Sequence, residues 1–293
     1  MQKISPFLWY DKEAGEAAKF YTSVFQNSKI KSSTKLTDTP SGTVEIVSVN
    51  LLGYDLTLMS AGPLFKFTPA TSFLVVCDSA EKVDAIWERL SPGGTTMMPI
   101  GEYPFSKRYG WTQDRFGLSW QVILMSDPAF RQSIVPTLMF VGNNTGKAEN
   151  AIKFYTSVFK NSSIGHLARY TKEELPEQEG NIKFGSFIIE DQPFAAMDSS
   201  RAHNFNFNES ISHEVHCENQ DEIDYFWKKL SSDPKSEQCG WLKDQYGVSW
   251  QIVPTILASM LQDKDRQKVA RVTQAFLKMN KFDIAQLHRA YEG

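Results

Sequence analysis

The sequence lacks the features that mark membrane, secreted and nucleic-acid-binding proteins. No apolar run approaches the roughly 20 residues that a helix needs to cross a bilayer. The chain begins directly with the aromatic segment 4–10, without a basic and apolar leader, so we expect no secretion. A net charge of −3 over 293 residues provides no general attraction to phosphate backbones or anionic membranes. We therefore predict neither a nucleic-acid nor a membrane partner.

Cysteine is scarce as well. The three cysteines, Cys77, Cys217 and Cys239, form no C-x-x-C pair. Cys77 and Cys217 stand at equivalent positions in two apolar segments, which is typical of buried thiols in a reducing compartment. The sequence therefore predicts a cytoplasmic protein.

The common motifs of cofactor binding and nucleophilic catalysis are also missing. The chain contains no glycine-rich dinucleotide fingerprint, no serine nucleophile elbow and no cysteine–histidine pair at a recognisable spacing. Pro92-Gly93-Gly94 follows a predicted helix and lacks the Lys-Ser/Thr of a phosphate loop. We therefore expect no organic cofactor.

What the sequence does contain is a repeat. The hexapeptide Phe-Tyr-Thr-Ser-Val-Phe occurs at 20–25 and again at 154–159, an offset of 134 residues (154 against 20). The pattern Gly-Trp, Asp, Gly, Ser-Trp-Gln occurs over 110–121 and again over 240–251, an offset of 130 (240 against 110). Between these patterns, Cys77 recurs as Cys217 at an offset of 140 (217 against 77). The chain is therefore a tandem duplication whose copies differ by short loop insertions and deletions.

Each copy contains two successive units of strand, helix and three strands. The predicted helices carry apolar residues at helical spacing, and the predicted strands are short and rich in branched and aromatic residues. In the first copy we expect helices at 12–25 and 79–90, and strands near 4–10, 30–36, 44–51, 55–59, 72–77, 95–98, 110–114 and 119–124. In the second copy we expect helices at 147–159 and 220–230, and leading strands at 136–141 and 211–217. Four such units place the chain in the α+β class.

The pattern changes after Pro254. Residues 255–293 have helical periodicity and no strand signal, so two or three helices are expected. An exposed apolar stripe would be a liability, so we expect these helices to pack on a domain surface; binding of a partner is the alternative. The expected organisation is a first domain at 1–126, a second at 132–254 and a helical tail at 255–293.

Several stretches in both copies resemble a known family. They are 6–21, 62–67 and 111–121 in the first copy, 205–209, 221–227 and 240–255 in the second, and 278–293 in the tail. These stretches are similar to the PhnB-like branch of the vicinal oxygen chelate superfamily, which includes glyoxalases, extradiol dioxygenases and bleomycin-resistance proteins. The resemblance implies that each pair of units curls into an incomplete eight-stranded barrel around a cavity. It also implies that the two copies pair as an intramolecular pseudo-dimer, an arrangement compatible with a monomer.

The resemblance also bears on a metal. Metal-using relatives carry His and Glu ligands on the first and last strands of the units, commonly a Glu four residues after the Gly of the last turn. Gln121 and Gln251 occupy this position here, and an amide is a weaker ligand than a carboxylate. We expect no tightly held metal; a divalent ion in the second domain is the alternative.

Strand alternation predicts which side chains face each cavity. In the first copy Leu74 and Val76 face it, with Leu8 and Tyr10 on the corresponding face of the opening strand. In the second copy the same parity selects Ser212, Glu214 and His216, while His213 lies on the other face as a structural residue. The predicted ligand-binding residues are Leu8, Tyr10, Met59, Phe65, Phe67, Trp111, Gln121, Phe140, Met197, Phe205, Phe207, Trp241 and Gln251.

Two functions follow from these expectations. In the first, the protein binds a small apolar or aromatic molecule in a barrel cavity without a metal. In the second, it is a glyoxalase- or dioxygenase-type lyase, isomerase or transferase with one active site in the second domain, around Glu214, His216 and Gln251. Glu214 would be the general base and His216 its orienter or proton carrier, with Asp198 just past the preceding strand. The plainer alternative is that Glu214 and His216 pair locally on a solvated strand face.

Overall fold

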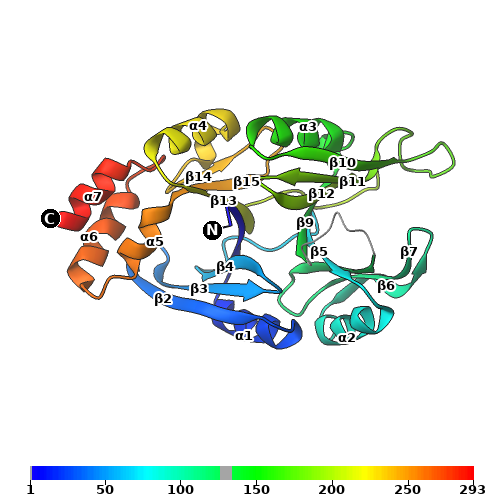
Figure 1. The fold of residues 1–293 in the computed structure, drawn as a ribbon, viewed down its shortest axis with the longest axis horizontal. Helices are drawn as coiled ribbons and strands as arrows, with labels where there is room; N and C mark the ends of the chain where they lie inside the picture. Colours follow the sequence, from blue (N-terminus) through cyan, green and yellow to red (C-terminus); the bar gives the residue numbers. More distant parts are fainter. Residues whose placement is uncertain (1, 126–133) are drawn as a thin grey trace.

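The computed structural model describes residues 2–125 and 134–293, in which the four predicted units follow one another (Figure 1). The first unit comprises β1 (Ile4–Tyr10), α1 (Ala14–Val24), β2 (Lys29–Thr39), β3 (Gly42–Leu51) and β4 (Tyr54–Ser60). The second comprises β5 (Thr71–Cys77), α2 (Ala80–Leu90), β6 (Thr95–Tyr103), β7 (Ser106–Gln113) and β8 (Ser119–Leu124). The third comprises β9 (Ile134–Phe140), α3 (Ala148–Val158), β10 (Ser163–Arg169), β11 (Ile182–Ile189) and β12 (Gln192–Asp198). The fourth comprises β13 (Ile211–Cys217), α4 (Gln220–Leu230), β14 (Trp241–Lys243) and β15 (Ser249–Pro254).

The fourth unit is shorter than its equivalent in the first copy. Where the second unit builds the long hairpin of β6 and β7, the described chain between α4 and β15 holds only the 3-10 turn Pro234–Ser236 and the three-residue β14. This shortening explains why the repeat offset falls from 140 to 130 residues across it. The sequence predicted two or three tail helices, and three follow: α5 (Thr255–Leu261), α6 (Arg266–Phe276) and α7 (Ile284–Glu292).

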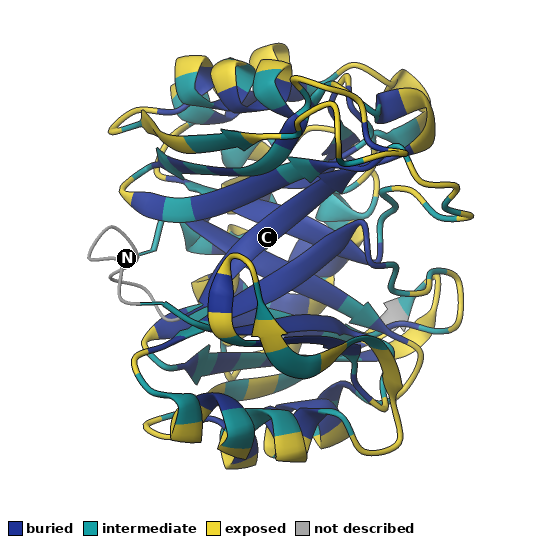
Figure 2. Ribbon diagram, turned by 90° about the vertical axis from the view of Figure 1, so that its right-hand side faces the viewer, coloured by how far each residue is buried: buried dark blue, intermediate teal, exposed yellow. Residues whose placement is uncertain are grey.

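The strands form two mixed sheets, which confirms the α+β class. One sheet has seven strands in the order β14-β15-β13-β1-β4-β3-β2, and the other has eight in the order β10-β11-β12-β9-β5-β8-β7-β6. In Figure 1 helices α1 and α2 lie along one side of the molecule, and α3 and α4 lie along the opposite side. Figure 2 shows the buried strands crossing the middle, with partly exposed helices above and below.

Each sheet takes one unit from each copy, whereas the expected barrels took both units from one copy. In the seven-stranded sheet β1 pairs antiparallel with β13, with Ser5 opposite Glu214. In the eight-stranded sheet β5 pairs antiparallel with β9, with Leu74 opposite Val135. The physical reason is that the four leading strands offer equivalent edges, so the repeat itself does not select which two of them pair.

Each copy nevertheless keeps its own core on the helix side of the sheets. Ala18 and Tyr21 of α1 share a cluster with Val83 of α2, and Ile152 of α3 shares another with Ile223 of α4. The two copies therefore share both sheets, whereas the helices of each copy pack on a core of their own.

In each copy a buried aspartate accounts for much of the repeated sequence. In the first copy Oδ2 of Asp114 accepts hydrogen bonds from the hydroxyl of Tyr21 (2.7 Å) and Nε1 of Trp120 (2.9 Å). In the second copy Asp244 accepts the same bonds from Tyr155 (2.7 Å) and Trp250 (2.9 Å). Each aspartate also accepts from two backbone amides of its own turn. Burial raises the pKa of Asp244 to about 6, and the hydrogen bonds oppose this shift.

The tail packs on the seven-stranded sheet, as expected from its apolar stripe. Met260, Val272 and Leu287 are buried in the core that contains α4 and β15, and Val269 packs with Leu36 and Val44 of the first copy. The tail therefore contacts both copies. Among the described helices, none is long and apolar enough to cross a membrane.

Candidate ligand-binding cavity

A cavity of about 760 Å³ lies on the inner face of the seven-stranded sheet. Both copies and the tail line it, because the sheet joins β1–β4 to β13–β15 and α5 and α6 lie beside it. Six of the residues predicted for a site meet here although they come from different copies. They are Met59, Phe65, Glu214, His216, Trp241 and Gln251.

A polar cluster lies at one part of the cavity wall. Oε2 of Glu214 accepts hydrogen bonds from the hydroxyls of Thr57 (3.0 Å) and Ser5 (3.3 Å). The same Ser5 oxygen lies 2.8 Å from Nε2 of His216. Gln251, opposite Glu214 in the parallel ladder, donates through Nε2 to Ser212 (2.9 Å). Glu214 and His216 are thus linked through a serine of the first copy, and the predicted site is not confined to the second domain.

Burial sets the charges of this cluster. Glu214 is only 8% exposed, and burial raises its pKa to about 7, against smaller opposing effects of the bonds from Thr57 and Ser5. Burial, and secondarily the positive charge of Lys3, lowers the pKa of His216 to about 4. At neutral pH Glu214 is therefore close to its titration midpoint while His216 is neutral. The carboxyl group can accept or release a proton there.

Aromatic side chains form the adjoining wall. The ring of Trp9 packs edge-on against Phe65 (centroids 5.1 Å apart) and Trp241 (6.2 Å), and Phe7 packs edge-on against Trp241 (5.7 Å). Such contacts hold large apolar rings in defined orientations. The wall is therefore preformed and contains rings from both copies.

The prediction of which face of β1 lines the cavity was wrong. Leu8 and Tyr10 are buried in the helix-side core, and Ser5, Phe7 and Trp9 line the cavity instead. Nearly every residue of β1 is buried, so its hydrophobic pattern does not distinguish the two faces. Ser5 and Trp9, which the prediction missed, lie on the predicted strand. They alternate with the predicted residues Leu8 and Tyr10, so the prediction had chosen the opposite face.

Alternation predicted the faces of β13 correctly. Glu214 and His216 line the cavity, whereas Val215 and Cys217 lie in the helix-side core. His213 also lies away from the cavity, with its ring centroid 5.4 Å from that of Phe194 and 5.2 Å from that of Trp250. Burial lowers the pKa of His213 to about 4, so it is a neutral core residue.

The remaining predicted residues lie elsewhere. Trp111 and Met197 of the eight-stranded sheet, and Phe205 of the segment after β12, belong to an apolar cluster around Leu74 and Tyr109. Gln121 is buried beside it, accepting a bond from Tyr109 (2.7 Å) and donating to Ser72 (2.8 Å). Phe67, Phe140 and Phe207 pack in helix-side cores. Asp198 accepts bonds from the amides of Gly146 and Ala148 at the start of α3, so it is a capping residue outside the polar cluster.

The residues present do not fit a resident divalent metal. Across 2–125 and 134–293, no three or more His, Cys, Asp or Glu side chains are grouped to hold one. In the cavity, Ser5 engages both Glu214 and His216, and Gln251 offers only an uncharged amide. Such a set offers too few anionic oxygens for a hard cation.

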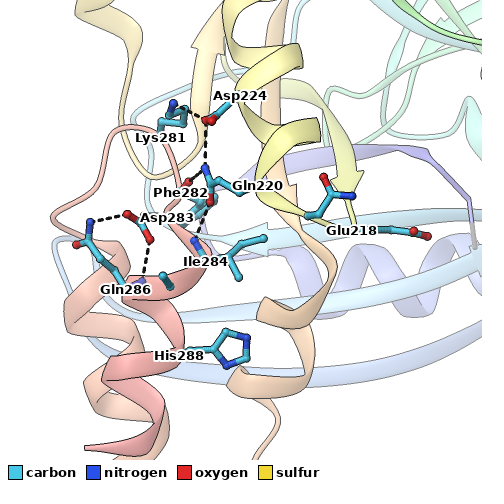
Figure 3. A pocket seen from close by; sticks show the side chains of 11 residues that line it. Glu218, Gln220, Asp224, Lys281, Phe282, Asp283, Ile284, Gln286 and His288 are labelled. Carbon is cyan, nitrogen blue, oxygen red and sulfur yellow. Dashed lines mark hydrogen bonds and ion pairs between the residues drawn. The ribbon is translucent and has the colours of Figure 1, made fainter.

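An open depression of about 800 Å³ lies between α4 and the start of α7 (Figure 3). Several of its polar groups bond neighbouring groups: Lys281 pairs with Asp224, Gln220 accepts from the amide of Ile284, and Asp283 caps α7 through the amide of Gln286. These contacts attach the tail to α4.

Comparison with known proteins agrees with this architecture. The sequence pattern of the family described as 3-demethylubiquinone-9 3-methyltransferase matches residues 2–123 and again residues 132–253. A PhnB protein from Bacillus cereus is 36% identical over 42% of this chain and all of its own length, with a TM-score of 0.40. Glyoxalase I from Zea mays is 12% identical and matches in fold, over 90% of this chain and 98% of its own, with a TM-score of 0.52. None of the curated proteins compared with the chain matches it. The chain therefore belongs to the PhnB-like family described as 3-demethylubiquinone-9 3-methyltransferase.

Proposed function

We propose that the chain binds a small organic molecule in the cavity of the seven-stranded sheet, without a resident metal. The observation that carries this proposal is that the polar cluster of Ser5, Thr57, Glu214 and His216 adjoins a wall of aromatic rings in one cavity. Cavities of roughly 300–1,000 Å³ are typical of small-molecule sites, and this one lies in that range. Rings such as Trp9 and Trp241 would supply contact area, and the cluster around Glu214 would orient a hydrogen-bonding group of the ligand.

The test uses two equivalent tryptophans with different surroundings. Trp241 lines the cavity, whereas Trp111, its counterpart in the first copy, lies in the apolar cluster of the other sheet. We expect calorimetric titration of the full chain with 4-ethylphenol to detect binding, weakened about tenfold or more by Trp241→Leu, which is about 1.4 kcal/mol. Trp111→Leu is the control and should leave the affinity near that of the original chain. Equal losses in both variants, or no binding at all, would contradict the proposal.

The pKa of Glu214 favours a second candidate, an enzyme that transfers a proton. A general base works best when its pKa lies near the operating pH, and that of Glu214 is about 7. Thr57 and Ser5 hold Oε2, and no residue in the described part of the chain bonds Oε1, the oxygen that would face a ligand. Glu214 would take a proton from carbon or oxygen, while neutral His216 would orient Ser5.

Deuterium exchange tests this second function. A ketone with acidic C–H bonds and a phenol head, 4-hydroxyphenylacetone, would be incubated with the protein in D₂O and followed by NMR. Exchange at the carbon beside the carbonyl should be accelerated by the original chain and not by Glu214→Gln. If the two chains give the same rate, proton transfer by Glu214 is refuted, while ligand binding stands or falls on the titration above.

A further inference from the structure

We infer that the cavity is built for an elongated amphiphile, with a polar head at the Glu214 cluster and an apolar chain directed toward α5 and α6. This inference rests on the proposed binding function and specifies its ligand class. Its basis is a change of polarity along the strands that line the cavity. The strands β1, β3 and β4 show this change in the same direction in space, and β2 shows it as far as Leu36, beyond which Thr39 and Ser41 also line the cavity.

The parallel strands β1 and β4 show it first. Cavity-lining residues near their starts are polar, such as Ser5 and Thr57, and those near their ends are apolar, such as Trp9 and Met59. The ladder places Trp9 beside Met59, so the two apolar positions coincide. Trp9 lies four positions after Ser5, a distance of about 13 Å at roughly 3.3 Å per residue.

The antiparallel strands β3 and β2 show the same change of polarity, at positions aligned with those of β4. Ser48 stands opposite Thr57, and Ile46 stands opposite Met59. Further along, Leu36 of β2 stands opposite Val44. At the polar end Lys31 of β2 pairs with Asp55 of β4 over 2.7 Å. Because β3 runs against β4, this agreement reflects position in the cavity rather than position along the chain.

The tail closes the apolar end. Leu36, Val44 and Val269 form a buried cluster, against which Leu261 of α5 and Phe276 of α6 pack. Leu261 and Phe276 also line the cavity. An apolar chain that passes Met59 would therefore meet side chains of the tail.

The tail holds this place because the fourth unit is short. β2 and β14 are the edges of the seven-stranded sheet, and α6 contacts β2. Beside β14, the amides of Cys239 and Gly240 donate to the carbonyls of Met279 (2.8 Å) and Asn280 (2.7 Å). The tail thus bridges both edges of the sheet in the region where the first copy carries β6 and β7. Its residues would set the length of chain that the cavity accepts.

A homologous ligand series tests the inference. We would measure the affinity of the full chain for 4-alkylphenols from 4-ethylphenol to 4-octylphenol by calorimetry. Each added methylene should tighten binding about fourfold, the equivalent of about 0.8 kcal/mol, until the chain reaches the tail. Phe276→Ala should move the end of this rise to a longer chain, and Leu261→Trp should move it to a shorter one. Glu214→Gln should weaken every member by a similar factor and leave the gain per methylene unchanged.

Val272→Ala is the matched control. Val272 lies on the same helix as Phe276 and is fully buried, but it does not line the cavity. The amphiphile inference is overturned if the tail variants and Val272→Ala give the same dependence of affinity on chain length. It is also overturned if 4-ethylphenol binds and longer alkyl chains do not increase the affinity. In both cases the binding function stands. If no member of the series binds, both proposals fail.

Discussion

The hydroxyl oxygen of Ser5 lies 2.8 Å from Nε2 of His216, although the two residues are 211 positions apart. The contact exists because β1 of the first copy pairs with β13 of the second. The same hydroxyl reaches Oε2 of Glu214, so one serine joins the two ionisable groups of the cavity. Its single hydrogen can be donated to only one of them at a time.

Removing either hydroxyl at Glu214 should raise the pKa of that carboxyl above its value of about 7. Hydrogen bonds from Ser5 and Thr57 stabilise the ionised form, so their loss favours the protonated one. We expect Ser5→Ala and Thr57→Val each to produce an upward shift of up to about one unit. Carbon-13 NMR of the labelled carboxyl, assigned with Glu214→Gln, measures it. Ser212→Ala is the control, because Ser212 bonds Gln251. A downward shift in Ser5→Ala would contradict this assignment.

Glu214 should make the protein less stable as pH rises toward neutrality. Its pKa is about 7 in the folded chain against an ordinary value of 4.5, so the folded state retains the proton over this window. The favourable contribution is full below pH 4.5 and is lost as pH passes 7, amounting to about 3 kcal/mol at roughly 1.4 kcal/mol per unit. Urea unfolding from pH 4.5 to 8 should therefore show the original chain losing stability relative to Glu214→Gln. Parallel pH profiles for the two chains would be inconsistent with the raised pKa.

His213→Phe should stabilise the protein. Neither ring nitrogen of His213 has a hydrogen-bond partner among the described residues, and the first copy carries Phe73 at the equivalent position beside its tryptophan. Removing an unsatisfied buried polar group is worth about 1–3 kcal/mol at neutral pH.

The advantage of His213→Phe should grow in acid. The pKa of His213 is about 4 in the folded chain against 6.5 ordinarily, so the unfolded chain takes up a proton first as pH falls from 6.5 to 4. Chemical unfolding at pH 7 and pH 4.5 measures both effects. A variant that is less stable at both pH values would show that the imidazole has a favourable role.

Gly240→Ala should displace the tail. Gly240 has a φ of +84°, and a Cβ there would lie 2.3 Å from Cε2 of Phe282. Gly247 has the same φ with nothing within 4 Å of a Cβ, so Gly247→Ala reports the backbone effect alone, about 1 kcal/mol. We expect a larger loss in urea unfolding for Gly240→Ala, together with faster proteolysis of residues 255–293. Adding Phe282→Ala should reduce the difference; equal losses in the two glycine variants would show that the contact is unimportant.

The local sequence pattern was sufficient to predict the units and several residues of the site. Alternation in β13 put Glu214 and His216 on one face because its two faces differ in polarity. It failed in β1, where both faces are buried and Leu8 and Trp9 are equally apolar. The role of the tail was also outside local pattern, since Leu261 and Phe276 meet Met59 only after α5 and α6 fold back across the sheet.

The sequence by itself determined the four units and a tail of two or three helices, because the periodicity within each segment specifies them. The contacts of each aspartate with its tyrosine and tryptophan join two units, so they depend on the tertiary structure. The tertiary structure decided which leading strands pair, and so which residues share a cavity. Equivalent strand edges in a duplicated chain compete for the same partner, and that competition is resolved by contacts between distant segments. Ser5, Thr57 and Glu214 form one cluster because β1 pairs with both β4 and β13.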